Sequence, residues 1–265
     1  MASLVASLAT IVWFVLGLYV YVALIRQISV RTPAVADPPA KAFGVPEAIG
    51  AALLMSLLVV GLINGGASNT TELNTWDLIN NFILTAVVVL VLGAFLAFRG
   101  FNLDTLAGLS KVSIVRVAAI GAILLLMAYP LVFLAEKMVE RIFGEASTRQ
   151  DVVELFSGSR TIQQRTMIIL LAVGVAPVAE ELVFRFFLYG VIRRYFGVVV
   201  GLLVNAILFA AVHHHLPSFA PLFVLGCCFT LAYEWSGSIL VPMTMHSLFN
   251  SVTLVLLAFP GLVQQ

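Results

Sequence analysis

The composition indicates an integral membrane protein. The chain has 265 residues, of which 62% are hydrophobic and 10% are charged, whereas soluble domains carry about 25% charged residues. This excludes a soluble globular domain. The net charge of +1 and the absence of a basic stripe give no indication of a nucleic-acid partner. We predict a multi-pass protein of the lipid bilayer, in the cell membrane of a prokaryote or an endomembrane of a eukaryote.

Eight stretches predict transmembrane helices, since a span needs about 20 mostly apolar residues. They are 3–25, 45–63, 78–98, 114–135, 167–191, 197–213, 220–236 and 239–258. No lysine or arginine precedes the first stretch, which favours a helix over a signal peptide. The predicted fold class is all-α, a polytopic transmembrane helical bundle of eight spans. We divide this single membrane domain into an N-terminal four-span region, 1–145, and a C-terminal four-span region, 146–265.

The connections between these stretches alternate in basic charge. Basic loops stay cytoplasmic, so eight spans place both chain ends outside and eight basic residues inside: Arg26, Arg31, Lys41, Arg99, Lys111, Arg116, Arg193 and Arg194. Segment 136–165 is an exception, because it carries five basic and five acidic residues and is placed outside by parity alone. Within it, 146–161 predicts a short amphipathic helix at the interface.

Three charged residues lie within the stretch APVAEELVFRFFLYG, residues 176–190. A charged side chain near the bilayer centre costs at least about 2.5–3.5 kcal/mol, so each one needs a reason. Glu181 and Arg185 are four residues apart and share a helix face, which predicts a buried ion pair. Glu180 lies about 100° around the helix, which leaves its carboxylate to face a polar cavity.

Three further polar side chains stand out within the spans: His213, His246 and Asn250. Asn250 follows His246 by four residues, so both lie on one helix face. At about 1.5 Å per residue, these groups and Glu180 have similar depths in the bilayer. We therefore predict that the four side chains converge on one cavity. The alternative for His246 and Asn250 is interhelical hydrogen bonding.

These residue types favour hydrolysis by an activated water. No serine or cysteine is tied to a base by a motif, and the chain has neither H-E-x-x-H nor G-x-S-x-G. Glu180 suits a general base, an imidazole suits proton transfer, and Asn250 suits oxyanion stabilisation. Alternatively, Glu180, His213 and His246 are a familiar ligand set for one divalent metal such as zinc. Both mechanisms remain open, and a peptide bond within the membrane is the favoured target.

The order of these residues resembles a known family signature. It consists of three motifs, Glu180-Glu181-x-x-x-Arg185, Phe209-x-x-x-His213 and His246-x-x-x-Asn250. This pattern is similar to that of the CAAX protease and bacteriocin-processing (CPBP) family of intramembrane proteases, which includes the type II CAAX prenyl endopeptidases. The resemblance covers residues 165–258. Phe186 departs from it, since the family often has glycine after the arginine.

The resemblance implies a role for each motif residue. Glu180 and His213 would activate the water, and His246 and Asn250 would complete the site. The support residues would be Glu181, Arg185 and Phe209. The family is usually described as metallopeptidases, although a metal-free glutamate mechanism has also been argued. The implied substrate is a membrane-embedded or lipid-anchored protein or peptide.

Two other functions use the same residues. An ion-coupled transporter would also carry intramembrane Glu, Arg and His, but the interiors of the first four spans have no charge and no inverted repeat is evident. The second is a non-catalytic immunity or scaffold protein on the same fold, which the resemblance allows. Such a scaffold would keep working without Glu180 or His213.

Overall fold

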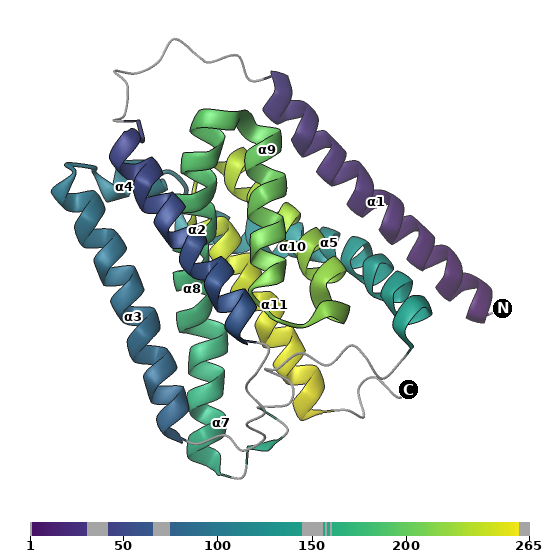
Figure 1. Cartoon of the computed structure of the whole chain (residues 1–265). Coiled ribbons are helices and arrows are strands. Elements are labelled where there is room, and N and C mark those ends of the chain that lie inside the picture. Colours follow the sequence, from purple (N-terminus) through teal and green to yellow (C-terminus); the bar gives the residue numbers. More distant parts are fainter. Residues whose placement is uncertain are drawn as a thin grey trace.

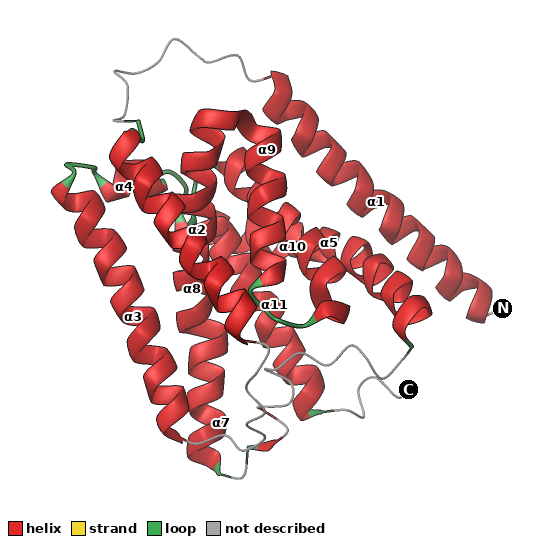
Figure 2. Cartoon of the chain, in the orientation of Figure 1, coloured by secondary structure: helices red, strands yellow, loops and turns green. Residues whose placement is uncertain are grey.

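The computed structural model describes residues 2–30, 42–65, 75–144, 156, 158–159 and 161–259. These residues form helices and connecting loops with no strand (Figure 2). The predicted all-α class is confirmed. The predicted amphipathic helix at 146–161 lies largely outside the described residues.

The helices follow one another in the order shown in Figure 1. They are α1 (Ala2–Val30), α2 (Val45–Gly65), α3 (Thr75–Phe98), α4 (Leu103–Ala107), α5 (Ile114–Phe143), α7 (Ile162–Ile169), η2 (Leu170–Val175), α8 (Ala176–Glu181), η3 (Leu182–Tyr189), α9 (Gly190–Ala211), α10 (Leu216–Ser236) and α11 (Leu240–Ala258). In the described part of the chain, seven helices are long and apolar enough to cross a membrane, with 162–211 taken as one. The chain is an integral multi-pass membrane protein.

The stretch 162–211 contains two of the predicted spans, 167–191 and 197–213, joined without a loop. Gly197 breaks the helix with φ 84° and ψ 172°, and the ribbon of α9 turns back on itself there (Figure 1). A Cβ at Gly201 would lie 3.1 Å from the backbone nitrogen of Arg193, although eight residues of straight helix span about 12 Å. The two predicted spans are therefore two limbs of a helical hairpin.

Two π-helical segments flank α8, with η2 before it and η3 after it. A π-helix has i→i+5 hydrogen bonds, and short π segments inside α-helices often occur at functional sites. Glu180 and Glu181, the last residues of α8, lie between the two segments. The backbone is thus irregular on both sides of the charged pair.

The core lies around α10, which packs against α1, α5, α9 and α11. Within the span of α10, 50% of the residues are buried inside the protein, compared with 11% in α2 and 6% in α3. The glycine at Gly226 allows α9 to approach closely, because a Cβ there would lie 3.2 Å from the Phe209 ring. The exposed side chains of α2 and α3 are mostly apolar, as lipid-facing surfaces require.

Segments that carry basic residues, among them the end of α3 and the first turns of α9, lie at one end of the bundle, at the top of Figure 1. Three contacts join the helices at this end: Trp235 of α10 donates to Gln27 of α1 (2.7 Å), the Ile239 amide donates to the Ala107 carbonyl of α4 (2.9 Å), and Arg193 of α9 pairs with Glu234 of α10 (2.8 Å). The residues of this end include Arg99, which pairs with the fully buried Glu47 of α2 at 2.8 Å. The alternation of charge in the sequence therefore corresponds to one basic end, while the membrane orientation stays a prediction.

We expect Gly197→Ala to destabilise the protein by about 1–3 kcal/mol, because only glycine adopts this backbone conformation without strain. The matched control is Gly93→Ala in α3, where a Cβ meets nothing within 4 Å and alanine should stabilise the helix by about 0.5–1 kcal/mol. Thermal unfolding in detergent measures both. Equal melting temperatures for the two variants would contradict the hairpin at Gly197.

Candidate active site

The site is built around the C-terminal end of α8. Helix α11 packs against α8 and η2, and it brings His246 to the two glutamates. Helix α9 supplies Phe209 and ends beside His213, and α10 supplies Phe229. Side chains from four helical segments therefore surround one acidic pair.

One oxygen of Glu181 holds two partners. Its Oε1 accepts from Arg185 Nη1 at 2.8 Å and from His246 Nδ1 at 3.0 Å. The Glu181 and Arg185 side chains are both fully buried, and that of His246 is 5% exposed. The predicted Glu181–Arg185 ion pair is confirmed. The same Glu181 oxygen also binds His246, which lies 65 residues later in the chain.

Aromatic rings surround the Arg185 guanidinium group. Its Cζ lies 4.1 Å from the ring centre of Phe209, 5.2 Å from that of Phe229 and 6.0 Å from that of Phe184. Ring faces attract a cation, and more strongly where water is excluded. The Gly226 carbonyl lies 3.5 Å from Nη2. These contacts compensate for the burial of a permanent positive charge in an apolar bundle.

His246 is held with one nitrogen directed to each glutamate. A carboxylate only accepts hydrogen bonds, so the bond to Glu181 places a proton on Nδ1. The other nitrogen, Nε2, lies 3.8 Å from Oε2 of Glu180, beyond direct hydrogen-bond distance. The rings of Phe209 and Phe229 flank the imidazole at 5.8 and 5.1 Å. The imidazole is therefore fixed in both tautomer and position.

Glu180 differs from its neighbour in exposure. Its side chain is 30% exposed, whereas Glu181 is fully buried. Its Oε2 atom is nevertheless covered, and no hydrogen-bond partner for it occurs in the described part of the chain. Glu180 thus presents a carboxylate at the border between the buried core and the accessible surface.

His213 lies just beyond the C-terminal end of α9. Its Nδ1–H donates to the Phe209 carbonyl at 2.7 Å, which leaves Nε2 of a neutral imidazole as an acceptor. Its ring contacts the Phe209 ring at 5.0 Å between centres, so both imidazoles touch the same phenyl group. Among the described residues, Glu180 has no ion-pair contact within 4 Å with His213. The nearer imidazole to Glu180 is that of His246, and joint action of Glu180 and His213 stays a prediction.

Asn250 lies one turn after His246 on α11. Its Nδ2 donates to the Ala172 carbonyl in η2 at 2.7 Å. This bond ties α11 to the segment that leads into α8. The amide has a second N–H that this bond does not use. The oxyanion role of Asn250 stays a prediction.

The metal hypothesis requires three donors close together. Within the described ranges, no group of three His, Cys, Asp or Glu side chains has a geometry that could hold a metal ion. Glu180 and His246 are close to each other, but His213 does not join them as a third ligand. The metal site therefore stays a prediction, and we derive no step through a metal.

Sequence reasoning missed several contacts of the site. Phe229 stacks on His246, and the Ala172 carbonyl accepts from Asn250, yet neither residue belongs to a motif. It also missed the contact between His215 Nδ1 and Ser218 Oγ at 2.7 Å, where His215 precedes the first residue of α10. A histidine three residues before a serine at a helix start is a local signal that could have indicated this last contact.

Comparison with known proteins supports the class of protein that this site defines. Residues 162–252 match the family described as type II CAAX prenyl endopeptidase Rce1-like, and this range contains every predicted site residue. The predicted resemblance to CAAX-type intramembrane proteases is thereby confirmed.

A particular relative is the membrane-embedded CAAX protease MroQ of Staphylococcus aureus (strain USA300). The chain is 24% identical to it over 137 residues, which are 49% of this chain and 56% of the relative. The chain thus spans about half the length of the curated relative that it matches. No solved structure matches the chain.

We expect Arg185→Ala to lose about 3–5 kcal/mol of stability, because it leaves the Glu181 carboxylate buried without its cationic partner. Arg116→Ala is the matched control, since Arg116 is exposed in the first turn of α5 and surface substitutions change stability by about 0.5 kcal/mol or less. Yield and melting temperature in detergent are the measurements. Normal values for Arg185→Ala would show that the pair does not support the fold.

Proposed function

We propose that the chain is an intramembrane endopeptidase that hydrolyses a peptide bond of a membrane-embedded or lipid-anchored protein or peptide. The observation that carries the proposal is the spacing of Glu180 Oε2 and His246 Nε2 at 3.8 Å. Two groups at this separation can both contact one water molecule or one substrate atom. A general base must come within hydrogen-bond distance of the proton that it removes, directly or through a water.

In the proposed reaction, Glu180 takes a proton from a water as the oxygen attacks the scissile carbonyl carbon. The C–N bond then breaks, and the proton passes to the leaving amine. His213 is the candidate for this transfer, because its Nε2 is not used by the bond to Phe209. The free Nε2 of His246 can accept a hydrogen bond from the attacking water. The second N–H of Asn250 is the candidate to stabilise the oxyanion. Glu181 acts through His246 and is a positioning residue.

The substrate class rests on the comparisons. The matched family is described as prenyl endopeptidases and the relative as a CAAX protease. A substrate anchored at the bilayer would reach Glu180 from the accessible side of the site. This supports a membrane-associated protein cut near a lipid anchor or a membrane segment.

We expect Glu180→Gln to abolish cleavage while leaving the melting temperature unchanged, because the amide cannot accept the proton and Glu180 makes no hydrogen bond through Oε2 in the described structure. The control is Glu140→Gln, which removes a carboxylate that pairs with Lys137 away from the site. Protein termini in membranes of cells that express each form are compared by mass spectrometry. A terminus that appears with wild type and Glu140→Gln, but not with Glu180→Gln, identifies a substrate. Identical termini for all forms would favour a non-catalytic scaffold.

We expect fluorophosphonates and iodoacetamide to leave the activity intact, because the proposed nucleophile is a water. A membrane-permeable chelator separates the metal-free mechanism from the metal-dependent one. Cys228 is buried and Cys227 half-buried, and neither His213 nor His246 contacts a serine or cysteine in the described part of the protein. The cleavage identified above is the readout. Loss of activity with labelling of Ser218 would indicate a serine mechanism through His215. Loss with a chelator that zinc reverses would establish the metal mechanism.

A further inference from the structure

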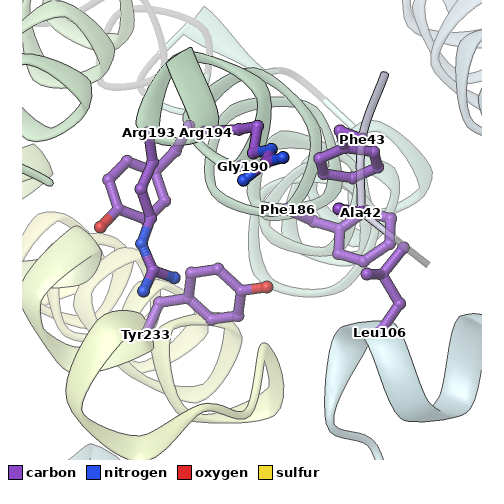
Figure 3. Close-up of a pocket in the computed structure, with 9 residues that line it drawn as sticks. Ala42, Phe43, Leu106, Phe186, Gly190, Arg193, Arg194 and Tyr233 are labelled. Carbon is purple, nitrogen blue, oxygen red and sulfur yellow. The ribbon is translucent and has the colours of Figure 1, made fainter. Parts of the chain in front are cut away.

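A cavity lies at the basic end of the bundle, and its lining includes none of the candidate active-site residues. Its volume is about 420 Å³, within the range of about 300–1,000 Å³ that is usual for ligand pockets. Figure 3 shows its walls, which come from residues 42–43 before α2, from α4, from the η3–α9 junction and from the end of α10. The nearest lining residue on the α8–η3 helix, Phe186, is six residues after Glu180, or about 9 Å along the helix.

One wall of this cavity is a polar cluster that is already paired. Arg193 Nη2 contacts Glu234 Oε1 at 2.8 Å, and the Tyr189 hydroxyl donates to Glu234 Oε2 at 2.8 Å. The Arg193 guanidinium lies beside the Tyr233 ring in Figure 3. This ion pair neutralises one arginine of the cavity and fixes that wall.

The other arginine supplies an uncompensated charge. Arg194 is exposed, and it forms no ion pair with any residue that the structure describes. Its guanidinium extends toward Gly190 and Phe43 (Figure 3). Gly190 leaves room for the Phe43 ring, since a Cβ there would lie 2.6 Å from the ring. Among the described residues, the cavity lining and its Glu234 partner therefore carry one net positive charge next to a packed aromatic wall.

The remaining lining is apolar, and it includes Phe43, Phe186 and Leu106. A ligand that suits both halves has an anionic group for Arg194 and a hydrocarbon part for the aromatic wall. Arginine binds phosphate oxygens through paired N–H donors. The basic end is also the part of the bundle that attracts anionic lipids, since basic pockets between transmembrane helices bind lipid head groups.

We propose that this cavity, defined by Phe43, Leu106, Phe186, Arg193 and Arg194, binds the phosphodiester head group of an anionic phospholipid. Arg194 contacts the phosphate, and the first part of the acyl chains lies against Phe43 and Phe186. The Arg193–Glu234 pair stays intact and forms the rim. This site is independent of the proposed protease function, because none of its residues contacts Glu180, His213 or His246 in the described structure.

Binding of a short-chain lipid to delipidated full-length protein tests the proposal. Dioctanoyl phosphatidylglycerol, dioctanoyl phosphatidylcholine and inorganic phosphate are titrated separately into protein in an uncharged detergent, with calorimetry as the readout. We expect phosphatidylglycerol to bind at least about fivefold more tightly than phosphatidylcholine, because one basic residue contributes about 1 kcal/mol toward an anionic lipid. Inorganic phosphate should not displace the lipid, since it lacks the acyl chains.

Two variants and one control separate this site from general attraction to the basic end. Arg194→Gln should weaken phosphatidylglycerol binding about fivefold. Arg116→Gln removes the same charge from an exposed residue outside the cavity and should change it less than about twofold. Ala42→Trp fills the cavity mouth and should weaken binding without a change of charge. Melting temperatures confirm that each variant is folded.

Three results would overturn the proposal. The first is equal weakening by Arg194→Gln and Arg116→Gln, which would indicate a diffuse electrostatic effect. The second is equal affinity for the two lipids. The third is displacement of bound phosphatidylglycerol by inorganic phosphate at a similar concentration. This result would identify a site for free phosphate. All three readouts are binding measurements, so they are unaffected if the chain is not a protease.

Discussion

The buried carboxylate of Glu181 is the group on which the site depends. An unpaired carboxylate in an apolar bundle is strongly unfavourable, and here a single oxygen is bound by both Arg185 and His246. Arg185 in turn is covered by the rings of Phe209 and Phe229. The need to neutralise one charge therefore draws together η3, α9, α10 and α11 around the end of α8.

The two adjacent glutamates have different environments because of helix geometry. Neighbouring side chains on a helix are about 100° apart, so only one of them can face the Arg185 side. Glu181 faces the core and is fully buried, and Glu180 remains 30% exposed. A structural carboxylate and a chemically available one thus occur side by side. His246 lies between them and links the stability of the core to the chemistry at its border.

The sequence predicted the features that arise from local periodicity. Apolar stretches of about 20 residues gave the spans, and the four-residue spacing of Glu181 and Arg185 gave their ion pair. Contacts between distant segments were not predictable, because nothing in the local pattern specifies which helices pack together. The bond of His246 to Glu181 and the stacking of Phe229 are of this kind. Glu47 was also overlooked, since its partner Arg99 lies 52 residues later in the chain.

His213, His246 and Asn250 are each oriented by a second group that is part of the fold. The Phe209 carbonyl fixes His213, Glu181 fixes His246, and the Ala172 carbonyl fixes Asn250. Such partners set the tautomer of an imidazole and the direction of an amide before any substrate arrives. A site arranged in advance does not need to reorient its dipoles during a reaction, which is the main source of electrostatic catalysis. The hydrogen bonds that hold the helices together are thus the same bonds that prepare the side chains for chemistry.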